Sequence, residues 1–136
     1  MKGSYILLIE LKNDTTISIG KLGKRQFDKG CYLYVGSALN SLEQRINKHL
    51  RSDKKLYWHV DYLLQHAKVV NVFYKENKAR EECNIAKTLY QRLNPVIGFG
   101  CSDCKCKSHL FYGPLEEIKS SIEKLQIHPY LLNANS

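Results

Sequence analysis

The stretch CYLYVGSALNSLEQRINKHL, residues 31–50, contains the change from strand to helix that decides the fold. Residues 31–35 are apolar and aromatic, which is typical of a buried strand, and Gly36-Ser37 is predicted to end that strand. Asn40 or Ser41 can cap a helix that begins here, and Ser41 and Gln44 have the spacing of a capping box. The stretch therefore predicts a strand, a tight break and a helix in close succession.

The predicted helix carries two polar side chains on or beside its apolar face. At about 100° per residue, Leu42, Ile46 and Leu50 form an apolar stripe. His49 falls within this stripe and Arg45 at its edge, so we expect both side chains to lean toward the sheet. A partly buried histidine is, by itself, more often a structural residue than a catalytic one. Whether His49 is structural or catalytic therefore has to be judged from the motif around it.

Hydrophobic patterning along the rest of the chain predicts an α+β fold, with a small, mainly antiparallel sheet flanked by helices. A length of 136 residues fits one domain, residues 1–136, with a Cys- and His-containing C-terminal extension from about residue 98. The predicted strands are residues 4–11, 15–19, 31–35, 69–74 and 110–112, the last at a sheet edge. Further helices are predicted at about residues 58–66, 79–93 and 114–126.

The amino-acid composition and charge indicate which classes of protein this chain can belong to. Apolar residues make up 43% and charged residues 25%, as in ordinary globular domains. The apolar runs are too short to span a bilayer and the N-terminus lacks the pattern of a signal peptide, so we expect a cytoplasmic protein with no membrane partner. The net charge of +8 favours a phosphate-rich partner such as nucleic acid, although solubility alone would also account for it.

Two tripeptides are followed along the chain by two polar residues of the predicted helix. In order they are Gly3-Ser4-Tyr5, Tyr34-Val35-Gly36, Arg45 and His49. This order resembles that of the GIY-YIG nuclease superfamily. Within it, the chain is most similar to the small Uri-type family, prokaryotic proteins largely of unassigned function. The closer similarity is carried by YVGSA (34–38), YWHVDYLL (57–64), REECNIA (80–86) and GFGCSDCKCKSHLFY (98–112).

The resemblance implies a GIY-YIG-like fold and cleavage of DNA phosphodiester bonds with Mg²⁺ or Mn²⁺. Tyr34 would position or deprotonate the attacking water, with Tyr5 beside it. Arg45 would bind the phosphate through its planar fork of donors, and His49 would relay a proton or orient a tyrosine. Twenty-eight residues separate the two tyrosines, more than is usual in the superfamily, which predicts an inserted hairpin or loop.

The resemblance also implies one metal-binding glutamate on a later helix. Glu82 is the candidate because it shares a face with the apolar stripe of that helix, whereas Glu81 projects to one side. The stripe consists of Ile85, Ala86, Leu89 and Leu93. A carboxylate on a core-facing side is costly without a cation or hydrogen bonds. The alternative is that acidic residues simply suit the first turn of a helix.

The sequence CSDCKCKSHL contains four candidate zinc ligands: Cys101, Cys104, Cys106 and His109. Three thiolates and one imidazole suit tetrahedral Zn²⁺. Cys83 would replace Cys101 if the long helix passes nearby. The alternatives are buried reduced thiols, a redox-sensitive pair, or a role for His109 at the nuclease surface.

Lysines beside aromatic residues in KKLYWHVDYLL, residues 54–64, suggest contacts with a nucleic-acid backbone and a stacked base. The simpler account places the aromatic side chains in the core and pairs Asp61 with a nearby base. His59 is a secondary site candidate. The predicted backbone contacts are Lys21, Lys24, Arg25, Lys48, Arg51, Lys54 and Lys55.

Two other classes of function remain open from the sequence. One is a non-catalytic nucleic-acid-binding module on the same scaffold, with or without zinc. The other is a structural or partner-binding protein.

Overall fold

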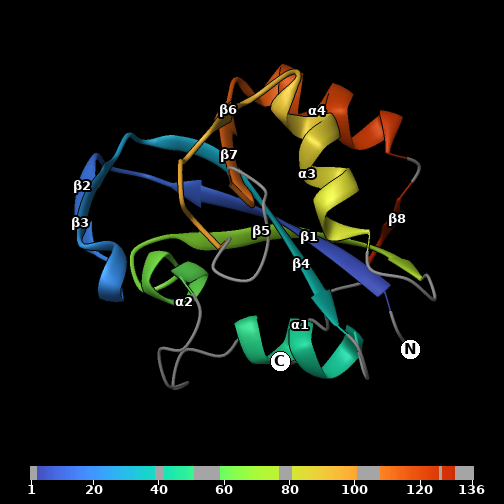
Figure 1. The fold of residues 1–136 in the computed structure, drawn as a ribbon, viewed down its shortest axis with the longest axis horizontal. Helices are drawn as coiled ribbons and strands as arrows, with labels where there is room; N and C mark the ends of the chain where they lie inside the picture. The colour runs from blue at the N-terminus through green and yellow to red at the C-terminus, as the bar shows by residue number, and fades with distance from the viewer. Residues whose placement is uncertain are drawn as a thin grey trace.

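A computed structural model describes residues 3–38, 42–50, 59–76, 81–100, 108–125 and 127–130, except for the side chains of Ala38 and Glu82. Its centre is a six-stranded sheet with the order β6-β7-β4-β1-β5-β8, in which every pair of neighbours is antiparallel (Figure 1). The strands are β1 (Gly3–Leu11), β4 (Gly30–Ala38), β5 (Lys68–Glu76), β6 (Asn94–Pro95), β7 (Leu110–Gly113) and β8 (His128–Pro129). The predicted α+β fold with a mainly antiparallel sheet is confirmed.

A separate hairpin and four α-helices complete the described part of the fold. The hairpin consists of β2 (Thr15–Ser18), a short 3₁₀ helix η1 (Gly20–Leu22) and β3 (Lys24–Phe27). The helices are α1 (Leu42–Leu50), α2 (His59–Leu63), α3 (Glu82–Tyr90) and α4 (Leu115–Lys124). The hairpin fills the long interval between Tyr5 and Tyr34, as predicted. Among the described residues, no helix combines the length and the apolar character needed to cross a membrane.

The sheet separates two apolar cores because successive residues of a strand point to opposite faces. Tyr5 and Tyr34 lie on the face covered by α1, α2 and the hairpin, which we call the tyrosine face. Ile6 and Val35 lie on the opposite face, covered by α3 and α4, which we call the α3 face. Figure 1 shows these two helix pairs on opposite sides of the sheet.

Two strand predictions are wrong. Gly36-Ser37 does not end its strand, because β4 continues to Ala38 and pairs with β1 over its whole length. Nor is residue 110–112 an edge strand, because β7 lies between β4 and β6. Beyond residue 98, β7 is part of the main sheet and pairs with β4 from Tyr34 to Cys31.

Each predicted helix is present, but α2 ends at Leu63 rather than near residue 66, and α3 ends at Tyr90 rather than near residue 93. On α1, Leu42, Ile46 and His49 are buried. On α3, the predicted stripe is buried as a whole: Ile85, Ala86, Leu89 and Leu93. Asn40 and Ser41, the two candidate caps of α1, lie outside the described residues.

Candidate active site

Strand pairing brings Tyr5 and Tyr34 onto the tyrosine face as diagonal neighbours. Tyr5 is opposite Gly36 and Leu7 is opposite Tyr34 in the antiparallel register of β1 and β4. The centroids of the two tyrosine rings are 6.4 Å apart. A Cβ atom at Gly36 would overlap the ring and hydroxyl of Tyr5, so only glycine lets this ring lie across β4. Gly36 therefore shapes the site rather than ending the strand.

His49 reaches the tyrosines from the buried side of α1. Its Nε2 lies 2.7 Å from the Tyr5 hydroxyl, a hydrogen bond between residues 44 positions apart. The His49 ring centroid is 5.4 Å from that of Tyr5 and 6.2 Å from that of Tyr34. The three side chains are almost closed to solvent, with exposed fractions of 1% for Tyr5, 5% for Tyr34 and 2% for His49.

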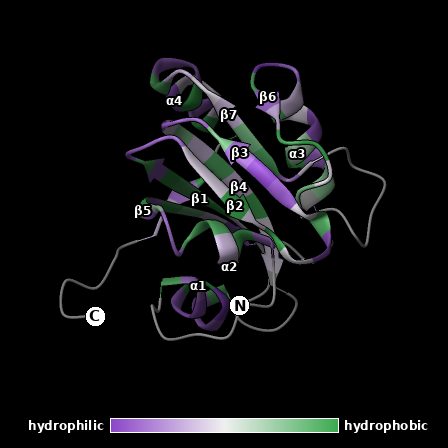
Figure 2. Ribbon diagram, turned by 90° about the vertical axis from the view of Figure 1, so that its left-hand side faces the viewer, coloured by the Kyte–Doolittle hydropathy of each residue, from purple (hydrophilic) through white to green (hydrophobic). Residues whose placement is uncertain are grey.

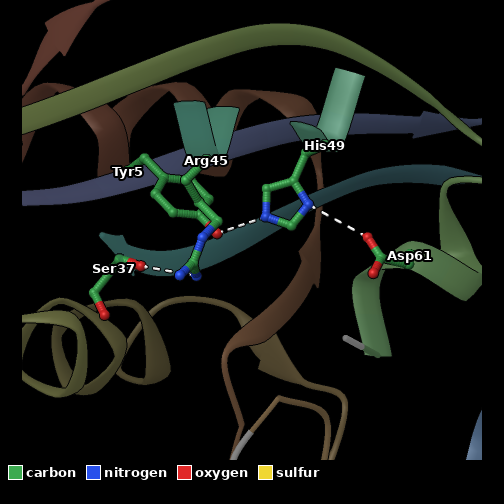
Figure 3. A network of polar contacts seen from close by, with 5 residues as sticks. All are labelled: Tyr5, Ser37, Arg45, His49 and Asp61. Atoms are coloured by element: carbon green, nitrogen blue, oxygen red, sulfur yellow. Dashed lines mark hydrogen bonds and ion pairs between the residues drawn. The ribbon is translucent and has the colours of Figure 1, made fainter. Parts of the chain in front are cut away.

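Asp61 completes the contact chain from the other side of His49. Its Oδ1 lies 3.4 Å from His49 Nδ1, and its side chain is 1% exposed. Figure 3 shows Tyr5, His49 and Asp61 in line. A carboxylate at this position favours the Nδ1–H form of the imidazole, which leaves Nε2 to accept the hydrogen of the Tyr5 hydroxyl. The arrangement links a phenol to a buried carboxylate through one histidine.

The sequence alone did not identify Asp61 as a site residue. It predicted that Asp61 pairs with a nearby base, and the structure pairs it with His49 of α1. The sequence feature that could have identified Asp61 is its position between Val60 and Leu63. These two apolar residues are both fully buried in the described fold. A carboxylate in such surroundings needs a partner.

Arg45 lies one helical turn before His49, as its position in α1 requires. Its Nη1 donates a hydrogen bond to the carbonyl oxygen of Ser37 at 3.2 Å, near the end of β4. Figure 3 shows the guanidinium directed at this carbonyl oxygen. Arg45 is half-buried, so it is more accessible than the two tyrosines or His49. The predicted residues Tyr5, Tyr34, Arg45 and His49 therefore gather at one place.

His59 interacts with a different part of the tyrosine face. Its Nδ1 accepts a hydrogen bond from the Gly100 backbone N–H at 2.8 Å. Its ring packs edge-on against Phe99, at 5.5 Å between centroids, and Phe99 in turn packs against Tyr34 at 6.3 Å. His59 thus supports the loop next to Tyr34 through Phe99. Burial lowers the pKa of its imidazole below the ordinary 6.5.

This arrangement predicts a pH-dependent stability. Above pH 6.5, His59 is neutral in both the folded and unfolded states. As the pH falls below that value, the unfolded chain takes up the proton first, so the folded state loses stability until the folded pKa is passed. Thermal unfolding from about pH 8 to about pH 5 should therefore show a larger fall in melting temperature for wild type than for His59→Asn. Asparagine retains an acceptor for Gly100 but does not titrate, so parallel curves would contradict this role.

Glu82, the predicted metal ligand, is the first residue of α3, but its side chain is not described. The apolar residues of α3 pack on the face opposite to Tyr5 and His49. In the described parts of the chain, no three His, Cys, Asp or Glu side chains converge to form a metal site. Asp61, the carboxylate beside His49, is buried and engaged with that histidine. The role of Glu82 as a metal ligand therefore stays a prediction.

The predicted zinc ligands fall partly outside the described residues, which exclude Cys101, Cys104 and Cys106. His109 is described and 3% exposed. Its carbonyl oxygen accepts a hydrogen bond from Val35 N–H at 2.9 Å, and its Nε2 contacts Cys83 of α3 at 3.9 Å. The His109 side chain therefore lies on the α3 face and does not join the His49 cluster.

The described members of the predicted set of backbone contacts lie on elements that cover the tyrosine face. Lys21 and Lys24 are exposed on the hairpin, and Lys48 is exposed on α1. Arg25 is half-buried and donates to the carbonyl oxygen of Ile97 at 3.4 Å. Figure 2 shows β3 as largely hydrophilic. The other predicted contacts lie outside the described residues: Arg51, Lys54 and Lys55.

Comparison with known proteins gives one match. No curated protein and no solved structure matches the chain. Residues 4–128, most of the chain, match the profile of a family described as a domain of unknown function, DUF123. That span contains the whole Tyr5–His49–Asp61 chain and the helix with Arg45. The protein therefore belongs to the DUF123 family.

Proposed function

We propose that this protein is a nuclease of the GIY-YIG type that cleaves DNA phosphodiester bonds. The observation that carries the proposal is the hydrogen bond between the Tyr5 hydroxyl and His49 Nε2, beside Tyr34 and with Asp61 behind the imidazole. Residues singled out by their resemblance to the superfamily motifs are distant in sequence, yet they meet on one sheet face. The position of Arg45 near them supplies positive charge at the most accessible side of the group.

The reaction forms a bond between water oxygen and phosphorus and breaks the bond to the leaving sugar oxygen. One proton must leave the water, negative charge grows on the phosphoryl oxygens, and the leaving oxygen must gain a proton from solvent. Arg45 would stabilise the growing charge through N–H donors directed at the phosphate. Tyr34 would orient the water, and Tyr5 would accept the proton of the water as it passes its own hydroxyl proton to His49, whose imidazolium form Asp61 stabilises. Each of these roles uses a group already within the cluster.

The burial of the cluster limits how a DNA phosphate can reach it. Tyr5 and Tyr34 have exposed fractions of 1% and 5%, whereas Arg45 is half-buried. A phosphate would therefore meet the cluster first at Arg45. Backbone contacts from Lys48 on the same helix and from Lys21 and Lys24 on the hairpin would hold the DNA over this face.

The resemblance implies that Mg²⁺ or Mn²⁺ takes part. A divalent cation supplies charge stabilisation to phosphoryl and leaving oxygens when it is bound. Since the described side chains do not assemble a site for it, metal dependence is an expectation for experiment, and the residues of the cluster account for phosphate binding and proton transfer.

A non-catalytic DNA-binding module is the second candidate. The near-complete burial of both tyrosines favours it, because a closed cluster stabilises a scaffold without touching substrate. The basic character of the chain, with a net charge of +8, is common to both candidates.

An assay that records cutting and binding together separates these candidates. Labelled single-stranded, duplex, flap and branched DNAs are incubated with excess protein in Mg²⁺, Mn²⁺ or chelator. A nuclease gives product with a divalent cation and none with chelator. Binding that weakens with salt but yields no product in any condition would establish the binding module instead. Neither binding nor product would leave a structural or partner-binding role.

A further inference from the structure

Three aromatic side chains lie on the tyrosine face at the β8 edge of the sheet, outside the proposed nuclease cluster. Tyr74 belongs to β5, His128 belongs to β8, and Tyr130 follows β8 directly. Tyr74 and Tyr130 are half-buried, and His128 is exposed. We call these three residues the edge aromatics. None of the roles proposed for DNA cleavage uses them.

Strand pairing places the edge aromatics in register with Tyr5. Tyr5 of β1 is directly opposite Tyr74 of β5, and Tyr74 is directly opposite His128 of β8. Directly opposite residues point to the same face of a sheet, with Cβ atoms about 4.5–5.5 Å apart. Tyr130 joins this face, because its N–H donates to the carbonyl oxygen of Val72 at 2.8 Å and its ring packs against the same core. A row of rings therefore leads from the buried Tyr5 outward to solvent at His128.

The rings of the edge aromatics touch one another without stacking. The Tyr74 centroid is 5.8 Å from that of His128, with 49° between the ring planes, and 6.1 Å from that of Tyr130, with 88° between the planes. Neither pair is parallel, so the rings do not stack on each other. Within the described part of the chain, the two hydroxyl groups and the imidazole have no hydrogen-bond partner.

Two tyrosines near the hairpin, on the same face, differ in this respect. The Tyr32 hydroxyl donates to the carbonyl oxygen of Asp28 at 2.6 Å, and the Tyr112 hydroxyl donates to that of Lys29 at 3.3 Å. Their polar ends are thus bonded to the backbone, as expected of tyrosines that serve the fold. The polar ends of the edge aromatics are instead available to a ligand.

We propose that the edge aromatics bind unpaired bases of a single-stranded DNA segment next to the cleavage site. This inference rests on the proposed function, because it takes the substrate to be DNA held over the tyrosine face. Bases stack on aromatic side chains when their faces are open, as they are in a single strand and are not inside an intact duplex. The hydroxyls and the imidazole also offer hydrogen-bonding groups to the base edges.

The separation between Arg45 and the edge aromatics fits one strand of DNA. Arg45 is hydrogen-bonded to Ser37 of β4, and Tyr74 lies two strands away on β5, beyond β1. Neighbouring strands are about 4.7–4.9 Å apart, so these positions are separated by about 10 Å across the sheet. That distance is the rise of about three stacked nucleotides. A phosphate at Arg45 and a base on Tyr74 can therefore belong to the same strand, and the exposed Lys48 of α1 adds positive charge to this face.

The test is equilibrium binding of the full chain to a labelled single-stranded oligonucleotide and to a duplex of the same length, in chelator so that no metal-dependent cutting occurs. Tyr74→Leu retains an apolar side chain on β5 but removes the ring. We expect it to bind the single strand roughly 5- to 150-fold more weakly than wild type, the range that one base stacked on an aromatic ring contributes. Duplex affinity should stay within about threefold of wild type, and Tyr74→Phe, which keeps the ring, should bind both DNAs within about threefold.

Tyr90→Leu is the matched control, because it removes an exposed tyrosine from α3, the helix that covers the opposite face. Its affinity for the single strand should equal that of wild type. No binding of the single strand by wild type, unchanged single-strand affinity in folded Tyr74→Leu, or an equal loss for single strand and duplex would each overturn the proposal. His128→Ala changes an exposed side chain, so it carries the same test if Tyr74→Leu fails to fold.

The outcomes for binding and for cleavage are separate. A selective loss of single-strand binding in Tyr74→Leu, in a protein that cuts no DNA, would support the edge aromatics as a binding surface and remove the proposed nuclease. Cleavage by wild type together with unchanged single-strand binding by Tyr74→Leu would support the nuclease and overturn the role of the edge aromatics.

Discussion

His49→Ala is expected to lower the single-turnover rate of DNA cleavage by about 100- to 10,000-fold, the range that positioned acid–base groups contribute. His49 is the only residue of the described cluster that contacts both Tyr5, at 2.7 Å, and Asp61, at 3.4 Å. Removing the imidazole breaks the proton path between phenol and carboxylate. The rate is measured with enzyme in excess, so that product release does not mask the chemical step.

Two further variants test whether a loss of rate in His49→Ala is due to this contact chain. Asp61→Asn retains the size of the side chain but removes the charge that favours the Nδ1–H imidazole, so its rate should fall between those of wild type and His49→Ala. His66→Ala removes an exposed histidine and should cleave at the wild-type rate. If His49→Ala shows a cooperative thermal unfolding transition, and so is folded, but cleaves as fast as wild type, the proposed role of the Tyr5–His49–Asp61 chain is wrong.

Gly36→Ala is expected to destabilise the fold by about 3 kcal/mol or more, the upper end of the usual cost of overpacking a core. The new Cβ would overlap the Tyr5 ring, and Gly36 lies in the continuous antiparallel pairing of β4 with β1, directly opposite Tyr5. Neither strand can move away without losing hydrogen bonds. For a domain of this size the melting temperature should fall by roughly 10 °C.

A double-mutant cycle attributes this loss to the Tyr5 contact. Tyr5→Leu removes the ring that the new methyl group meets, so the two changes together should cost less than their sum by about 1–3 kcal/mol. Ser37→Ala, on the next residue of β4, is the control for alanine in this strand and should change stability little. Strict additivity of Gly36→Ala and Tyr5→Leu would show that the glycine is required for another reason.

Sequence patterns predicted the helices and strands that show a clear repeat of apolar residues along the chain. The buried face of α1 followed from the spacing of Leu42 and Ile46, and the same reasoning placed His49 inward and Arg45 at the edge. The resemblance to a known motif then linked Tyr5 with these residues. The short strands β3, β6 and β8 were not predicted, because two to four residues carry too little pattern and are fixed by their partners.

What the sequence could not predict depends on contacts between distant elements. Glycine after a strand usually signals a turn, and only the Tyr5 ring lying over Gly36 explains why β4 continues. The partner of Asp61 depends on how α2 packs against α1. The side on which His109 lies depends on the register of β7 with β4, which brings it to Cys83 rather than to the tyrosine cluster.

The central claim is that the tyrosine face performs the cleavage, and a pair of matched variants tests it most directly. Tyr34→Phe removes the hydroxyl proposed to orient the water. Tyr32→Phe removes a hydroxyl two residues earlier on the same strand and face, where it donates to the carbonyl oxygen of Asp28 at 2.6 Å and burial raises the pKa of the phenol. We measure single-turnover cleavage of the best substrate by both variants after confirming that each is folded.

The account predicts that Tyr34→Phe cleaves at least about 100-fold more slowly than wild type, whereas Tyr32→Phe stays within about threefold of it. Equal rates for Tyr34→Phe and wild type, with both folded and binding the substrate alike, would contradict the claim that this cluster is the active site.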